Sequence, residues 1–371
     1  MKIPLMSPNI TDDDIDAAVE VMRSGALIQG KNVAAFESAV GEYLGVEHVV
    51  AVSSGTAALH LALLALGIGS GDEVIVPAFS FPATANVVEI VGARPVFVDI
   101  DIASFNIDAS LIECVKESQT RAIMPVHEFG LASDITEIAR LAQSHNLLVI
   151  EDAACAFGAA ENGKHVGTFG AIGAFSLHPR KAITSGEGGF LTTLDEKLGS
   201  KLRSLRNHGI ELIDGRQEFT GFGLNYRLTD FQAALVLSQF ARLDKNLTTK
   251  RRLADVYLDE LQDVNRILLP ALPQNKDHTW QTFHIILDES IDRDRVITEL
   301  KSKGVGTNFG AHCIPATNFY QEKYGLDCER EFPNALRAYR HGLALPIYEK
   351  LTAVEIRYIC DTLRQVFGNL R

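Results

Sequence analysis

The sequence predicts an α/β fold in which helices cover both faces of a mostly parallel sheet. In the first half of the 371 residues, short apolar segments alternate with segments of helical periodicity. Such alternation indicates parallel strands joined by helical crossovers. A chain of this length exceeds most single hydrophobic cores, so a second, smaller domain is also expected.

Composition narrows the functional classes. Hydrophobic residues make up 46% of the chain and charged residues 22%, which is ordinary for a globular enzyme. The net charge of -12, without a block of lysine or arginine, disfavours nucleic acids and anionic membrane surfaces as partners. No segment approaches the ~20 apolar residues of a membrane span, and the N-terminus lacks a signal-peptide core, so a cytoplasmic location is expected. The five cysteines form no C-x-x-C pair, which predicts reduced thiols and neither disulfides nor zinc.

The chain opens with two predicted helices. Thr11 is the expected N-cap of the first, with Asp14 three residues later and Gly25 at its end. Its apolar face consists of Ile15, Val19 and Met22. The second helix spans 33–44, where apolar residues again recur at helical spacing.

Strands and helices then alternate. Apolar segments predict strands at 48–52, 73–76, 95–98, 122–126, 147–150, 171–177 and 188–193. Helices are expected at 57–66, 133–145 and 230–243. Since parallel sheets of this kind bind ligands at the carboxyl ends of their strands, three segments at those ends are candidates for a functional site.

The first candidate is the small-residue turn at 53–57. Gly55 and Thr56 stand directly before a helix, where free N–H groups and the helix dipole favour an anion such as phosphate. An ordinary capped helix would have the same residues.

The second candidate is Asp152, which follows the strand at 147–150. It lies between an apolar strand and a run of small residues, so burial against a cationic or donor partner is expected, although a solvated loop carboxylate is the alternative.

The third candidate is Lys181, five residues after Ser176 ends a strand. A lysine between two buried strands is unusual, and burial would favour the free amine that a Schiff base requires. A lysine on an ordinary connecting loop is the alternative from this segment alone.

The segment 151–189 carries a family resemblance. It reads Glu-Asp-Ala-Ala-x-Ala-x-Gly-Ala, then Gly-x-x-Val-Gly-Thr-Phe-Gly, then Phe-Ser-x-His-Pro-Arg-Lys-x-Ile-Thr-x-Gly-Glu-Gly-Gly. This pattern resembles the pyridoxal-phosphate-dependent sugar aminotransferases of the DegT/DnrJ/StrS family, over nearly the whole chain. The resemblance implies fold-type I: a three-layer α/β/α large domain with a mixed, mostly parallel sheet, and a smaller α/β C-terminal domain. We place the boundary between residues 1–245 and 246–371.

The resemblance also implies roles for individual residues. Lys181 would hold pyridoxal 5'-phosphate (PLP) as a Schiff base and move a proton, and Asp152 would keep the pyridine nitrogen of the cofactor protonated. Other positions match the family's cofactor contacts. Gly55, Thr56 and Ser176 would contact the phosphate, and Phe81 would stack on the ring. Asn225 would reach the phosphate in the neighbouring subunit of a homodimer. Without the resemblance, Phe81 would be read as core.

Two positions depart from the family pattern. Cys155 stands where many members have glutamine or histidine beside the cofactor, so it is either a small packing residue under the ring or a weak contact. The loop 306–315 differs in spacing from the family, and its His312 is equally a substrate contact or a loop histidine without a role. His127 and Glu128 could touch donor or acceptor, with a satisfied loop pair as the alternative.

The implied activity is transfer of an amino group from L-glutamate to a keto group of a nucleotide-linked sugar. Two half-reactions would share one site, for amino-sugar, surface-glycan or secondary-metabolite synthesis. A sugar dehydratase of the same fold is an alternative, but it has a histidine in place of the lysine. A non-catalytic PLP-binding regulatory protein is the second alternative. The acceptor sugar depends on loops near 26–30, 211–222 and 308–320, whose geometry the sequence does not give.

Overall fold

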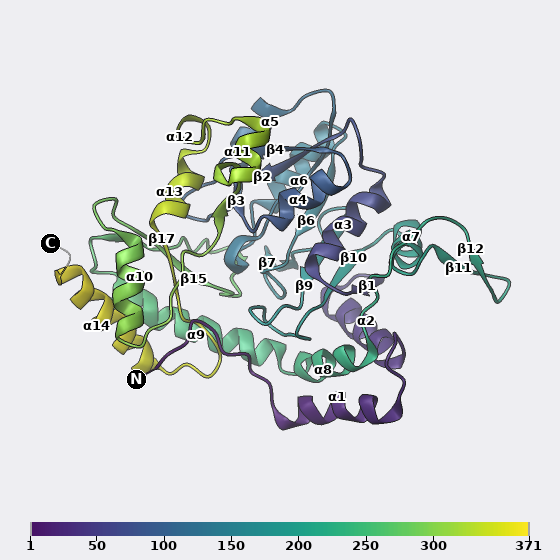
Figure 1. Ribbon diagram of the computed structural model, residues 1–371, viewed down its shortest axis with the longest axis horizontal. Helices are drawn as coiled ribbons and strands as arrows, with labels where there is room; N and C mark the ends of the chain where they lie inside the picture. Colours follow the sequence, from purple (N-terminus) through teal and green to yellow (C-terminus); the bar gives the residue numbers. More distant parts are fainter. Residues whose placement is uncertain (1, 370–371) are drawn as a thin grey trace.

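The computed structural model describes residues 2–369 and is built around a seven-stranded sheet (Figure 1). Its strands, in spatial order, are β1 (His48–Val52), β10 (Gly189–Thr193), β9 (Ile172–Ser176), β6 (Leu148–Asp152), β5 (Thr120–Ile123), β2 (Glu73–Pro77) and β4 (Arg94–Val98). β10 is antiparallel to β1 and β9, whereas the remaining neighbours are parallel. The prediction of a mixed, mostly parallel sheet is therefore confirmed.

Helices cover both faces of the sheet. One face is covered by α3 (Gly55–Leu66), α4 (Ala83–Ile90) and α7 (Glu196–Arg206), and the other by α2 (Lys31–Leu44), α5 (Ile112–Val115), α6 (Ile135–Ser144) and α8 (Asp230–Phe240). Side chains alternate accordingly along β1, where Val50 packs in the α3 core and Val49 in the α2 core. The three-layer α/β/α prediction is confirmed.

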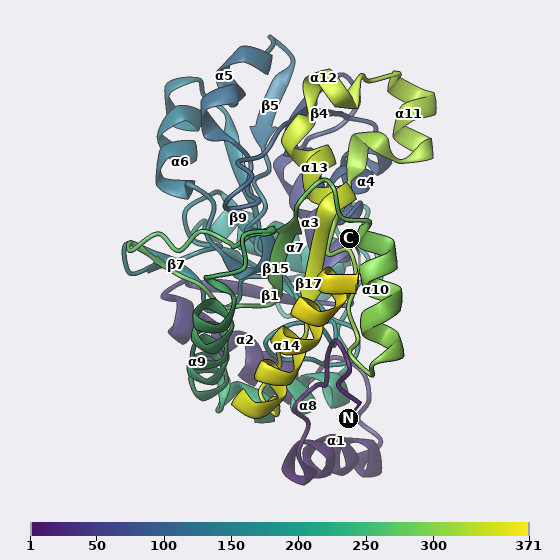
Figure 2. The same cartoon turned by 90° about the vertical axis from the view of Figure 1, so that its left-hand side faces the viewer.

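A second core lies in the C-terminal part of the chain. It joins β13 (Ile267–Leu268), β15 (Phe283–Leu287) and β17 (Gly342–Leu345) to α9 (Leu243–Leu261), α10 (Arg293–Ser302) and α14 (Ala353–Asn369), which Figure 2 shows around the small sheet. Helices α11 (Asn318–Tyr324), α12 (Cys328–Glu331) and α13 (Pro333–His341) instead contribute to the core of the large sheet. The division after residue 245 stays a prediction.

Shorter elements complete the chain. They are the pair β3 (Phe79–Ser80) with β16 (His312–Cys313), the sheet of β14 (Lys276–Asp277), β7 (Ala160–Glu161) and β8 (Lys164–His165), the hairpin of β11 (Ile210–Ile213) and β12 (Arg216–Phe219), and the 3-10 turns η1 (Ala109–Leu111), η2 (Glu128–Gly130) and η3 (Ile314–Ala316). The hairpin projects from the body of the molecule in Figure 1. Across residues 2–369, no helix has both the length and the apolar character needed to cross a bilayer.

The first helix, α1 (Asp12–Ser24), has its predicted ends but not its predicted face. Thr11 and Asp14 form a capping box, and Gly25 is the left-handed C-cap. Two of the three apolar residues expected to face the protein point outward instead, because Ile15 is 49% exposed and Met22 is 48% exposed. Val19 is half-buried.

Polar contacts determine how α1 packs. The carboxylate of Asp14 is fully buried and accepts hydrogen bonds from Ser238 Oγ and Arg242 Nη2, both at 2.6 Å. These contacts turn the Asp14 side of the helix, with Ala18 and Val21, toward α8. Apolar periodicity cannot reveal a helix that docks through a buried carboxylate.

Candidate active site

A cavity of about 400 Å³ opens where β2, β5, β6 and β9 end and α3 begins. That size is within the usual range for a small-molecule site. Most of the residues that sequence reasoning selected lie on its wall, namely Gly55, Thr56, Phe81, Asp152, Cys155, Ser176 and Lys181. The fold therefore brings together four segments that are separate in the sequence.

Lys181 lies on the loop between β9 and β10. Its Nζ lies 3.0 Å from Sγ of Cys155, which faces it from the segment after β6. The loop itself is held by Gln239, whose side chain accepts from Thr184 N at 3.0 Å and donates to Thr184 O at 2.7 Å. The amine is thus presented to the cavity from a fixed backbone.

Asp152 ends β6 and is buried in the cavity wall. Its Oδ2 accepts a hydrogen bond from Thr84 Oγ1 at 2.9 Å, and its Oδ1 accepts one from Ala154 N at 3.2 Å. Burial raises the pKa of Asp152, while these hydrogen bonds and the charge of Lys181 oppose that rise. A protonated ring nitrogen placed against this carboxylate would compensate for its burial.

The N-terminus of α3 forms an anion cradle. Ser54 caps the helix by accepting from Ala57 N at 3.0 Å, whereas Thr56 is exposed. A Cβ on Gly55 would lie 2.9 Å from Cβ of Ser176, so only glycine allows the strand end and the helix to approach this closely. Exposed N–H groups and two hydroxyls in this position suit a phosphate.

Phe81 presents an apolar face to the same cavity. Its side chain is 67% exposed although the residue follows a buried strand and lines the cavity wall. An exposed aromatic ring on a cavity wall is available to stack on a planar ligand. The alternative that Phe81 is a core residue does not hold, because the ring is not buried.

Two predicted residues lie outside this cavity wall. Asn225 is exposed and forms a β-bridge with Asn207, near the base of the β11–β12 hairpin. His312 pairs with Ser80 in the short β3–β16 sheet, and its ring packs against Phe309 and Tyr339. Contact of Asn225 with a neighbouring subunit and contact of His312 with substrate stay predictions.

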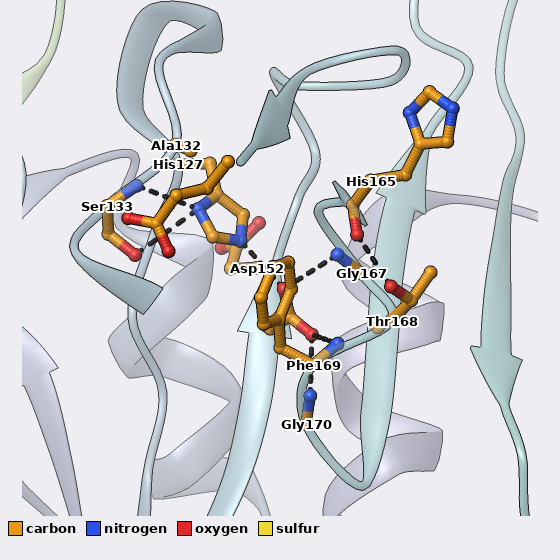
Figure 3. Close-up of polar contacts among 12 residues, drawn as sticks. His127, Ala132, Ser133, Asp152, His165, Gly167, Thr168, Phe169 and Gly170 are labelled. Carbon is orange, nitrogen blue, oxygen red and sulfur yellow. Dashed lines mark hydrogen bonds and ion pairs between the residues drawn. The ribbon is translucent and has the colours of Figure 1, made fainter. Parts of the chain in front are cut away.

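Glu151, next to Asp152, faces away from the cavity. Successive side chains of a strand alternate, so the two carboxylates point to opposite faces of the sheet. Glu151 is fully buried and accepts hydrogen bonds from the loop before β9, from the N–H groups of Gly167 (2.6 Å), Phe169 (2.7 Å) and Gly170 (2.7 Å). Figure 3 shows Gly167, Phe169 and Gly170 on one loop, with dashed lines at their nitrogens.

His127 completes this buried network and does not contact the cavity. Its Nδ1 accepts from Ser133 N at 3.0 Å, so the ring proton lies on Nε2, which is 3.1 Å from Oε2 of Glu151 (Figure 3). The neighbouring Glu128 lines the cavity instead. His127 and Glu128 are therefore not a pair.

Sequence reasoning missed some polar residues of the wall. Thr84 and Ser80 connect the Asp152 carboxylate to the β3 segment, and Gln281 reaches the wall from the C-terminal half. Gln281 also donates to Arg180 O at 3.0 Å, which ties the lysine loop to that half. No local pattern marks these residues, because their roles depend on which loops meet.

Comparison with known proteins identifies the family. The family model described as the DegT/DnrJ/EryC1/StrS aminotransferase family matches residues 8–364. The chain belongs to this aminotransferase family. It is 38% identical to GDP-perosamine synthase from Caulobacter vibrioides, with 98% of each chain covered.

Solved structures agree with this assignment. A DegT DnrJ EryC1 StrS aminotransferase from Brucella abortus has a TM-score of 0.89 at 33% identity, with 96% of each chain covered. Spr1654 from Streptococcus pneumoniae, described as a sugar aminotransferase and solved in its PLP-form, has a TM-score of 0.93 at 26% identity and covers all of both chains. The protein is thus a PLP-dependent transaminase, as predicted, and the alternative of a non-catalytic regulatory protein is not retained.

The residues of this aminotransferase fit the cofactor. The cradle at Gly55 and Ser176 suits its phosphate, the exposed face of Phe81 suits its ring, and the buried carboxylate of Asp152 suits its pyridine nitrogen. Lys181 supplies an amine within the same cavity.

Proposed function

We propose that this aminotransferase moves an amino group from L-glutamate to the keto group of a nucleotide-linked sugar. The observation that carries the proposal is the cavity in which the Lys181 amine and the Asp152 carboxylate lie together beside an anion cradle. The names of relatives support the acceptor class, because one is a GDP-perosamine synthase and another is the spore coat polysaccharide biosynthesis protein SpsC from Bacillus subtilis, 35% identical.

In this proposal each residue has one task. When bound, PLP supplies an electron sink that stabilises a substrate carbon after it loses its proton. Lys181 binds the cofactor and afterwards carries the proton at its Nζ. Asp152 holds the pyridine nitrogen protonated, Phe81 orients the ring, and Gly55, Thr56 and Ser176 hold the phosphate. Cys155 is small enough to leave room beside the Lys181 amine. The sugar dehydratase alternative is disfavoured, because Lys181 occupies the position where those enzymes have histidine.

A substrate screen tests this function. We expect the purified enzyme to release 2-oxoglutarate from L-glutamate continuously when a nucleotide-linked keto sugar is present. Without the sugar, release should stop after a single turnover. If the enzyme transferred the amino group to simple 2-oxo acids and to none of the nucleotide-linked keto sugars, the proposed acceptor class would be contradicted.

The phosphate cradle gives one quantitative prediction. Gly55→Ala places a Cβ 2.9 Å from Cβ of Ser176, so one of the two segments must shift away from the cradle. We expect the dissociation constant for PLP to rise at least about tenfold, which corresponds to losing one hydrogen bond to a charged group. Fluorescence titration of the cofactor-free enzyme measures it. Gly69→Ala, just beyond the other end of α3, is the matched control, because a Cβ there meets only an ordinary contact, 3.5 Å from Val91 O. An equal effect of both variants would contradict the cradle.

The homodimer proposal is tested by mixing two variants. A site needs Lys181 from one subunit and, in this proposal, Asn225 from the other. The Lys181→Ala protein and the Asn225→Ala protein are therefore mixed in equal amounts, unfolded and refolded together. Each mixed dimer should contain one intact site, which gives about a quarter of the wild-type sites in a random mixture. Activity that does not exceed that of the separately refolded variants would show that Asn225 does not act across the interface.

A further inference from the structure

The loop that carries Lys181 is supported from outside itself. Residues 177–188, between β9 and β10, contain neither helix nor strand, so no regular ladder of hydrogen bonds holds their backbone. Gln239 holds one side of the loop at Thr184. The other side, at Arg180, is held from the C-terminal half of the chain.

This second support is the Trp280 turn, residues 278–282. Trp280 has a left-handed φ of 52°, which is uncommon and strained for a residue other than glycine. Its N–H donates to Nδ1 of His278 at 2.9 Å, and the two rings stack with their centroids 3.9 Å apart. Trp280 is also buried in the core of the C-terminal half, where it packs on Phe283. The turn is therefore held in one conformation by its surroundings.

The Trp280 turn contacts the backbone on both sides of the lysine amine. Nζ of Lys181 lies 3.0 Å from Sγ of Cys155. The side chain of Gln281 donates from Nε2 to the carbonyl of Arg180, the residue before Lys181, at 3.0 Å. Thr279 Oγ1 lies 3.3 Å from the carbonyl of Cys155. One turn thus helps to set the distance between the two segments that meet at Nζ and Sγ.

The turn is itself anchored to the cavity wall. Gln281 N donates to Phe129 O at 3.0 Å, and Thr279 N donates to Gly130 O at 3.0 Å. Oγ1 of Thr279 also lies 3.3 Å from Gly130 O, so its one proton is shared between that carbonyl and the carbonyl of Cys155. A Cβ on Gly130 would overlap Thr279 Oγ1, so the close approach of the two turns requires glycine.

The amide of Gln281 has one possible orientation. A backbone carbonyl only accepts, so the NH₂ group must face Arg180 O, and Oε1 must face the Thr282 hydroxyl, 2.9 Å away. The Thr282 hydroxyl is then the donor of that bond. Both residues line the cavity, and Thr282 is buried. The hydrogen bond to the lysine loop is therefore fixed in direction.

We propose that the Trp280 turn is a positioning element of the transamination site, in which Gln281 fixes the backbone that carries Lys181. Its hydrogen bond to Arg180 O holds the amine in place for attachment of PLP. Reacting groups must be held closely in position, because a displacement of about 1 Å costs up to roughly 100-fold in rate. The inference rests on the proposed role of Lys181 as the attachment point.

PLP binding in two backgrounds tests the proposal. Gln281→Leu keeps a side chain of similar size and removes the donor to Arg180 O. With Lys181 present, we expect the dissociation constant for PLP to rise about fivefold to tenfold, as for the loss of one hydrogen bond. In the Lys181→Ala background, where PLP binds without the covalent link, the same change should alter it by less than about twofold. Absorbance titration of the cofactor-free enzymes measures both values.

Two results of this titration would overturn the proposal. Equal weakening in both backgrounds would show that Gln281 acts on the cavity as a whole and not through the lysine loop. No weakening with Lys181 present would show that the hydrogen bond to Arg180 O does not position the amine. Gln143→Leu, the same substitution at an exposed position of α6, is the matched control and should leave the dissociation constant unchanged.

A conservative pair at Thr282 gives a second reading. Thr282→Val keeps the shape of the side chain and removes the hydroxyl that orients the Gln281 amide, whereas Thr282→Ser keeps the hydroxyl. We expect Thr282→Val to bind PLP at least about threefold more weakly than Thr282→Ser when Lys181 is present.

Tryptophan fluorescence shows whether the turn is retained in these variants. Trp280 is the one tryptophan of the chain and lies buried beside Gln281. If cofactor-free Gln281→Leu has the emission spectrum of the wild type, its weaker binding reports the lost hydrogen bond. If its emission shifts toward that of the unfolded protein, the Thr282 pair decides, and equal affinities of Thr282→Val and Thr282→Ser would overturn the proposal.

Mapping the attachment site separates this inference from the proposed function, because the mapping and the titration need PLP and no sugar. Borohydride reduction and peptide mass analysis locate the cofactor. Attachment at a lysine other than Lys181 would remove the role of that lysine and this inference with it. Attachment at Lys181, with unchanged binding in Gln281→Leu, would remove only the role of Gln281.

Discussion

Lys181→Ala should lower the rate of transamination at least about a thousandfold, since proton transfer by a positioned side chain alone contributes up to roughly 10⁴-fold. The variant loses both the covalent attachment point and the group that carries the proton. The loop should keep its shape, because Gln239 holds it through backbone contacts of Thr184 that do not involve the lysine side chain. Binding of PLP should therefore persist without the absorbance of the lysine-bound form.

Two measurements make this prediction specific. Single-turnover kinetics with L-glutamate report the first half-reaction, and the absorbance spectrum reports the covalent link. Lys201→Ala on α7 is the matched control, because that lysine is exposed and does not line the cavity. A Lys181→Ala enzyme that retains a tenth of the wild-type rate, with an unchanged spectrum, would be incompatible with the proposed role.

Glu151→Ala should lower the free energy of unfolding by about 3–5 kcal/mol, because it leaves several hydrogen-bond donors unsatisfied and each buried one costs about 1–3 kcal/mol. The substitution leaves four donors without their acceptor. Gly167 N and Nε2 of His127 are buried, whereas Phe169 N and Gly170 N are partly buried. Each unsatisfied buried donor is destabilising. His127 cannot compensate by moving its proton, because its Nδ1 already accepts from Ser133 N.

Glu151→Gln sharpens the stability test. A glutamine retains one acceptor oxygen but presents an NH₂ group to donors, so it should be nearly as destabilising as alanine. Urea unfolding at fixed protein and PLP concentration measures both variants, since ligand and dimer concentration shift apparent stability. Glu137→Ala, whose ion pair with Arg140 is exposed, should change stability by less than about 0.5 kcal/mol. A Glu151→Gln protein as stable as wild type would contradict the network.

The parts of the site that follow a single strand or helix were predictable from sequence. Asp152 and Ser176 end apolar strands, Lys181 follows one, and Gly55 begins a helix, so local pattern places them at one edge of a parallel sheet. The family resemblance then assigned roles that geometry alone does not give. The structure brings these residues to one cavity, as expected.

Other features depend on contacts between distant segments and could not be read locally. Glu128 follows His127 directly in the chain, but only the folded loop shows that the two side chains diverge, one to the network of Glu151 and the other to the cavity. In the sequence, nothing distinguishes Thr84 from other helix residues. Its role follows from the fold, in which Asp152 at the end of β6 accepts a hydrogen bond from its hydroxyl. The outward face of α1 has the same cause, since a buried carboxylate rather than apolar spacing sets its orientation.

The most direct test of the central claim is reductive trapping of the PLP-loaded enzyme with borohydride, followed by peptide mass analysis. The account predicts that one peptide gains the mass of the reduced cofactor and that fragmentation places the added mass on Lys181. Addition of L-glutamate before the reductant should release the cofactor from that peptide. Recovery of the added mass on another lysine, with the Lys181 peptide unmodified, would contradict the account.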